Sequence, residues 1–149
     1  MNGAGTIAVA VDGSPASEAP LAEALRLARD GRRPLLGVFV FDTGWADYIG
    51  NDWQSAAGAR QGFLDYIRGQ LEAQAEAARE QFVAATRGHA QARFAVIFGE
   101  PLETLCDLMA RSEAETLVAG RETFQVCGRP SVKTLARDLA RRVRSLRIV

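Results

Sequence analysis

The chain has 149 residues, of which 48% are hydrophobic and 24% charged, and its 18 basic and 18 acidic side chains give a net charge of zero. This length predicts a single domain, and the composition is typical of a globular protein that dissolves in water. The balanced charge argues against nucleic acid or an anionic membrane surface as a partner. We expect neither a membrane span nor a signal peptide, because no apolar run is long enough and the first residues carry no basic segment.

The small number of cysteine and histidine residues narrows the possible chemistry. Cys106 and Cys127 lack CxxC spacing, which favours reduced thiols in a cytoplasmic protein. His89 is the only histidine, which excludes most histidine-rich metal sites and weakens a Ser-His-Asp hydrolase. We therefore predict no catalytic residue and no metal site.

The stretch Thr6–Ser17 is the predicted centre of the fold. Residues 7–11 form an unbroken apolar run, as expected for a strand that helices cover on both faces. The polar triplet DGS, which begins at Asp12, follows directly, where an open α/β sheet places its ligand. Ser17 is the expected N-cap of a first helix, which should end at Gly31.

The rest of the chain alternates between strand-like and helix-like patterns. Strands are predicted at residues 6–11, 35–41, 93–98, 115–119 and 146–149, and further helices at Arg60–Arg87, after Pro101 and at Val132–Val143. This alternation indicates a parallel sheet with right-handed crossovers. The segment Asp42–Ala59 is predicted to be a long loop. It contains the aromatic residues Trp45, Tyr48 and Trp53. These side chains either only pack the loop against the domain, or they belong to a functional site or an interface.

Three motifs in order resemble the universal stress protein family. They are DGSxxS beginning at Asp12, GEP beginning at Gly99, and TLVAG ending at Gly120. The resemblance covers the whole chain. It implies a doubly wound α/β domain of the Rossmann-like, adenine nucleotide α-hydrolase-like kind, with five parallel strands in the order 3-2-1-4-5.

That order would place Asp12 beside Gly120 at the topological switch point. In the ATP-binding branch of the family, the loop after the fourth strand reads Gly-x-x-Gly, nine residues, then Gly-Ser or Gly-Thr. Here Thr123 and Lys133 replace the second and third glycines, whereas Thr134 keeps the final hydroxyl. A side chain in a left-handed conformation costs about 1–2 kcal/mol, so we expect weak or absent ATP binding. The resemblance implies these tentative nucleotide contacts: Val11, Asp12, Gly13, Ser14, Val40, Gly120, Arg121, Thr123, Lys133 and Thr134.

Two alternatives remain open at this crevice. Lys133, Arg121 and Arg129 either rebuild an anion site or are solvated loop charges. Asp12 either contacts a nucleotide or accepts hydrogen bonds from its own turn, and the two roles are compatible.

The resemblance therefore supports two functional hypotheses. The first is a cytoplasmic stress-response protein that acts as a binding or regulatory module with weak or lost ATP binding. The second is an ATP- or AMP-binding protein with slow, Mg²⁺-dependent ATPase activity. A third hypothesis, an enzyme that uses nucleophilic or acid–base chemistry, ranks last because no nucleophile–base pair is apparent.

The last strand is expected at an edge of the sheet, where unpaired backbone groups attract another strand. Antiparallel pairing with its own copy would give a two-fold homodimer, and the family resemblance implies the same contact. The expected interface residues are Leu146, Arg147, Ile148 and Val149.

Overall fold

A computed structural model of the chain describes residues 5–51, 58–126 and 128–149. Five parallel strands form one sheet in the order β3-β2-β1-β4-β5, which confirms the predicted fold class and strand order. The strands are β1 (Ile7–Ala10), β2 (Leu35–Asp42), β3 (Ala92–Gly99), β4 (Thr116–Ala119) and β5 (Leu146–Ile148).

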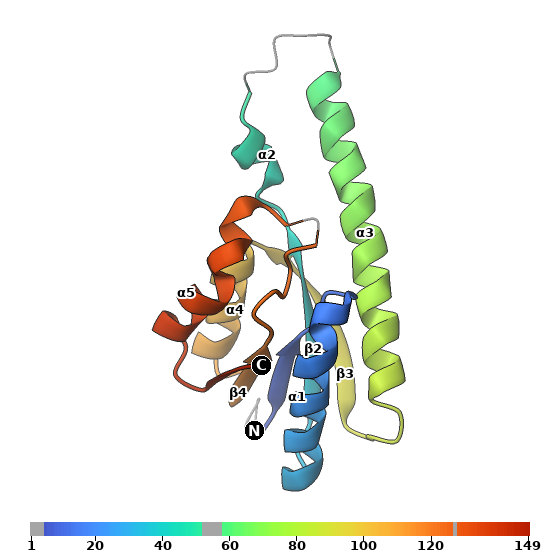
Figure 1. The fold of residues 1–149 in the computed structure, drawn as a ribbon, viewed down its shortest axis with the longest axis vertical. Coiled ribbons are helices and arrows are strands. Elements are labelled where there is room, and N and C mark those ends of the chain that lie inside the picture. The colour runs from blue at the N-terminus through green and yellow to red at the C-terminus, as the bar shows by residue number, and fades with distance from the viewer. Residues whose placement is uncertain (1–4, 52–57, 127) are drawn as a thin grey trace.

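Helices cover both faces of this sheet. The α-helices are α1 (Glu18–Gly31), α2 (Trp45–Ile49), α3 (Ala59–Ala85), α4 (Pro101–Ala110) and α5 (Leu135–Arg142). Two short 3₁₀ segments, Pro15–Ser17 and Pro130–Thr134, precede α1 and α5. Figure 1 shows α4 and α5 side by side, with α1 and α3 on the other side of the sheet.

The central strands are buried because both faces of the sheet carry helices. All four residues of β1 and nearly all of β2 are buried, as their continuous apolar runs predict. At the edge, β3 is less covered, and Phe98 remains 65% exposed. No helix in the described ranges has the length and apolar character needed to cross a membrane.

Two predicted segments differ from the observed elements. The expected loop Asp42–Ala59 contains the short helix α2, and its first residue belongs to β2. The expected helix Val132–Val143 begins as a 3₁₀ segment and becomes α-helical only at Leu135. Trp53 and Cys127 lie outside the described residues.

Ser17 precedes α1 but its side chain does not cap the helix. Its Oγ instead accepts a hydrogen bond from the Asp12 amide and donates one to the Asp12 carboxylate. Ser14 supplies a capping bond one turn earlier, because its Oγ accepts a bond from the Ala16 amide. The DGSxxS motif is therefore a closed hydrogen-bonded turn.

Candidate functional site

The carboxyl ends of β1 and β4 meet at the predicted switch point. The Phe124 amide, in the loop after β4, donates a 2.9 Å hydrogen bond to Oδ2 of Asp12. Gly120 lies against the start of α1, where an added Cβ would come within 3.0 Å of the Ala16 carbonyl oxygen. The two segments that carry the family motifs are therefore in direct contact.

Asp12 is almost completely buried, with 1% of its surface exposed, and its carboxylate is bonded on both oxygens. Oδ1 accepts hydrogen bonds from the Ser14 amide, the Ser14 hydroxyl and the Ser17 hydroxyl, at 2.7–2.8 Å. Oδ2 accepts the bond from Phe124. These four donors all come from the chain, so Asp12 acts here as the centre of its own turn.

The side chain of Phe124 occupies the crevice beside Asp12. It is 5% exposed, and its ring meets that of Phe39 edge to face, with centroids 5.8 Å apart. Phe124 adopts a left-handed conformation, with φ at 66°, whereas Thr123 does not. The backbone strain expected at Thr123 is therefore absent there and lies at Phe124 instead. Thr123 is instead held by its hydroxyl, which accepts a 2.8 Å bond from the Gly120 amide.

Two glutamines of α3 attach the surrounding loops to this helix. Gln81 accepts a bond from the Gly13 amide and donates one to the Ser14 carbonyl. Gln74 donates a 3.0 Å bond to the carbonyl of Val126. Gly13 has a φ of 82°, and a Cβ there would lie only 2.8 Å from the Ala78 amide nitrogen, so this glycine is required by close packing on α3.

A buried ion pair closes the other side of the crevice. Arg129 binds Asp42 through two bonds, Nε to Oδ2 at 2.8 Å and Nη2 to Oδ1 at 2.9 Å. The two side chains are 12% and 6% exposed. The bonds to Asp42 raise the pKa of Arg129 further above its ordinary value. The Arg129 side chain therefore attaches the loop after β4 to Asp42 at the end of β2.

The space left in the crevice is about 10 Å³, far below the roughly 300–1,000 Å³ of sites for drug-sized ligands, so a nucleotide does not fit there. Its lining residues are Phe39, Val40, Asp42, Leu71, Gln74, Pro101, Phe124, Val126, Gly128 and Val132. Of the predicted nucleotide contacts, Val40 alone lines this space. The other predicted contacts of the β1 and β4 ends do not line it: Val11, Asp12, Gly120 and Thr123 are buried, and Gly13 and Ser14 are half-buried.

The remaining predicted contacts do not join this cluster. Lys133 and Arg121 are exposed and, within the described ranges, form no ion pair. The Thr134 hydroxyl lies 2.7 Å from Oδ2 of Asp138 and 3.2 Å from the Ser131 carbonyl oxygen, within the start of α5. The α-helix begins only at Leu135, so the segment that reaches the crevice is the preceding 3₁₀ turn, from which Val132 lines the space.

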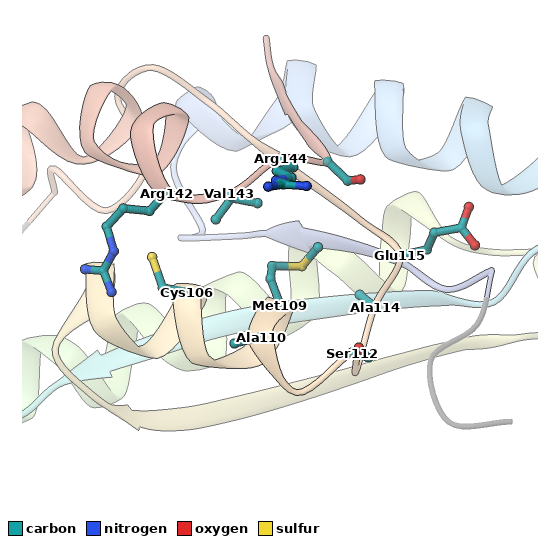
Figure 2. A pocket seen from close by; sticks show the side chains of 10 residues that line it. Cys106, Met109, Ala110, Ser112, Ala114, Glu115, Arg142, Val143 and Arg144 are labelled. Atoms are coloured by element: carbon teal, nitrogen blue, oxygen red, sulfur yellow. The ribbon is translucent and has the colours of Figure 1, made fainter.

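A larger cavity, of about 530 Å³, lies between α4 and the segment that joins α5 to β5 (Figure 2). Cys106 and Met109 of α4 line it, opposite Arg142. Burial raises the pKa of the Cys106 thiol above its ordinary value, so this sulfur is a poor nucleophile at neutral pH. Arg142 is paired with Glu103, and its hydrogen bond lowers the pKa of that carboxyl.

The part of the chain that the structure describes contains no group of three or more His, Cys, Asp or Glu side chains suited to a metal ion. The single histidine, His89, lies at the far end of α3, where Nε2 is 2.9 Å from the Arg33 carbonyl oxygen.

Sequence reasoning missed the residues that fill and seal the crevice, namely Phe124, Gln74, Gln81 and the Arg129–Asp42 pair. The glutamines did leave a signal, because they lie seven residues apart on the apolar stripe of the long helix. A polar residue on such a stripe indicates a buried hydrogen bond. Phe124 left only a weak signal, as an aromatic residue in an otherwise polar loop.

Comparison with known proteins supports the motif analysis. The universal stress protein family model matches residues 4–125. No curated protein matches the chain. Among solved structures, UspA from Lactobacillus plantarum is 22% identical with a TM-score of 0.64, over 100% of this chain and 98% of that chain.

Two similar structures were solved with nucleotides. A universal stress protein in complex with cAMP is 19% identical, with a TM-score of 0.60, over 97% of this chain and 94% of that chain. One from Archaeoglobus fulgidus in complex with dAMP is 18% identical, with a TM-score of 0.62, over 96% and 95%. At these identities the likeness shows the shared fold.

Proposed function

The chain belongs to the universal stress protein family, and from this premise we propose that it is a cytoplasmic stress-response protein that binds or regulates a partner and has lost most of its affinity for ATP. The observation that carries this proposal is the closed crevice. Asp12 has no oxygen free of hydrogen bonds, and the space that the Phe124 side chain lines is only about 10 Å³. A nucleotide would have to displace both.

Displacing this loop would be costly. The ring of Phe124 is buried against Phe39, and removing a Phe side chain from a core costs about 3–5 kcal/mol. The Arg129–Asp42 bonds would have to break as well. Each 1.4 kcal/mol spent on opening reduces ligand affinity tenfold, so the closed loop alone should weaken nucleotide binding by about a hundredfold or more.

We expect isothermal titration calorimetry with ATP, AMP and cAMP, each with and without Mg²⁺, to show no saturable binding at micromolar nucleotide. Phe124→Gly removes the ring and suits the left-handed backbone at this position. It should therefore bind AMP more tightly than the unaltered protein. Submicromolar ATP binding by the unaltered protein would contradict the proposal.

The second candidate is an ATP- or AMP-binding protein with slow, Mg²⁺-dependent ATPase activity. It is favoured by the cAMP and dAMP found in two structures of the same fold. It requires the loop after β4 to open and release Asp12. Phosphate release from ATP that depends on Mg²⁺ and disappears in Asp12→Asn would support this candidate over the first.

We also propose a homodimer paired through β5. This strand pairs with β4 on one side, and no described strand lies on its other side. Leu146 and Ile148 pack against the core, whereas Arg147 reaches the other face and binds Glu23 of α1 at 2.6 Å. The outer edge of β5 therefore offers backbone groups to a second copy without disturbing Arg147.

Replacing Ile148 with proline should convert this dimer to a monomer, because proline cannot donate to a strand ladder and its ring disfavours pairing. Light scattering at tens of micromolar protein measures the mass directly. The control variant is Val83→Ala, at an exposed position of α3, because a proline there would break the helix. It should leave the mass unchanged. A monomeric unaltered protein, or a dimer that survives Ile148→Pro, would refute this interface.

A further inference from the structure

Another cavity lies on the α3 face of the sheet, next to the closed crevice, with which it shares Asp42 and Leu71. It measures about 240 Å³ and lies where the ends of β2 and β3 meet α2 and α3. Its lining residues are Phe41, Asp42, Thr43, Trp45, Ala46, Leu64, Ile67, Arg68, Leu71 and Phe98. A groove of about 320 Å³ continues from it along α3 and shares Phe41, Arg68 and Phe98. The family motifs contribute no residue to either space.

Trp45, which lines the cavity, carries a polar group with no partner among the described residues. Nε1 of Trp45 is buried and, within the described residues, donates no hydrogen bond. A buried donor without an acceptor costs about 1–3 kcal/mol and is rare in folded proteins. This nitrogen is the one buried side-chain N or O atom in the described ranges that lacks a partner. A ligand that supplies an acceptor would remove the cost.

The charges around the cavity favour an anionic acceptor. Arg68 lines both spaces and makes no ion pair with the described residues. The carboxylate in the lining, Asp42, is already neutralised by Arg129 and also accepts a bond from the Gly44 amide. The cavity itself therefore offers a guanidinium and an indole N–H and is lined by no unpaired carboxylate of the described residues, whereas Glu72 and Glu76 line only the adjoining groove.

The remaining lining fits a flat apolar body. The rings of Phe41 and Phe98 lie 4.7 Å apart at an angle of 32°, and Phe98 is 65% exposed. Trp45 is packed edge-on against Tyr48 and Phe63, with centroids 5.7 and 6.1 Å apart, which fixes the indole. Aromatic faces of this kind favour an aromatic ligand. The volume is below the roughly 300–1,000 Å³ of sites for drug-sized ligands, which limits the ligand to one or two rings.

We propose that this cavity binds a small aromatic carboxylate, with its rings against Phe41 and Phe98 and its carboxylate bonded to Arg68 and to the indole N–H of Trp45. Asp12 does not line this cavity. The proposal for this cavity does not depend on whether the protein binds nucleotides.

The test uses 2-naphthoate with the full chain. The chain has two tryptophans, so nitrogen–proton correlation NMR gives two indole signals, and Trp45→Phe identifies that of Trp45. We expect naphthoate to shift the Trp45 signal downfield in a saturable manner, and excess AMP to leave the shift unchanged. Calorimetry should show affinity reduced about tenfold or more by Arg68→Gln, since a hydrogen bond to a charged group contributes about 1.5–3 kcal/mol.

Two controls distinguish binding at this site from nonspecific attraction of the naphthoate anion to basic side chains. Arg79→Gln alters an arginine of the same helix that is already paired with Glu76, and it should leave naphthoate affinity unchanged. The uncharged 2-naphthamide should bind the unaltered protein and Arg68→Gln equally. No movement of the Trp45 signal at millimolar naphthoate would overturn the proposal, as would equal weakening by the two arginine variants. Octanoate binding as tightly as naphthoate would overturn the preference for an aromatic ligand.

Discussion

Replacing Asp12 with alanine is expected to lower the free energy of unfolding by about 3–4 kcal/mol. The substitution removes the acceptor of four hydrogen bonds at a position that is 1% exposed. The amides of Ser14 and Phe124 would then be left without an acceptor, each costing about 1–3 kcal/mol. Urea denaturation followed by circular dichroism measures the loss.

Asp12→Asn should cost less than Asp12→Ala, because an amide oxygen can still accept the three bonds that reach Oδ1. Its NH₂ group would face the Phe124 amide, so that bond is lost. Asp107→Ala, on the exposed side of α4, is the matched control and should change stability by less than about 0.5 kcal/mol.

This experiment separates the two roles considered for Asp12. A carboxylate that organises its own turn stabilises the protein without any ligand. A loss below about 1 kcal/mol for Asp12→Ala would show that the four bonds contribute little net stability, and would favour a role in ligand binding. In that case nucleotide titrations of Asp12→Asn would be the deciding measurement.

The sheet could be predicted from sequence because its signals are local. The apolar run at residues 7–11 requires cover on both faces, and the alternation of such runs with amphipathic segments leaves few possible topologies. Strand order came from the family motifs, and the paired registers bear it out. The short helix α2 was missed because five residues are too few to show helical periodicity.

The state of the crevice could not be predicted because it depends on contacts between distant segments. The missing loop glycines indicated an altered phosphate loop and predicted backbone strain at Thr123. In the structure, Phe124 is the residue with the left-handed backbone. The burial of the Phe124 ring against Phe39 holds that conformation. Similarly, Arg129 was expected either to help rebuild an anion site or to be a solvated loop charge, because its partner, Asp42, is 87 positions away in the sequence.

Arg129→Ala should destabilise the protein by about 3–5 kcal/mol, the usual cost of removing one partner from a buried ion pair. Asp42, 6% exposed, would keep only the bond from the Gly44 amide. Arg129→Lys should recover part of the loss, since it keeps the charge but cannot form the two-point contact. Arg137→Ala, at a residue whose side chain is 65% exposed, should change stability by less than about 0.5 kcal/mol.

A double-mutant cycle with Asp42→Asn tests whether the pair is the cause. If the loss arises from the unpaired Asp42 carboxylate, Arg129→Ala should cost much less when Asp42 is already asparagine, and the coupling energy should exceed about 1.5 kcal/mol. Additive losses in the cycle would show that Arg129 stabilises the loop by packing alone. Because this pair holds the loop that carries Phe124 against β2, Arg129→Ala should also increase the affinity for AMP, measured by calorimetry. Unchanged AMP affinity in a folded Arg129→Ala protein would mean that Phe124 closes the crevice without help from the ion pair.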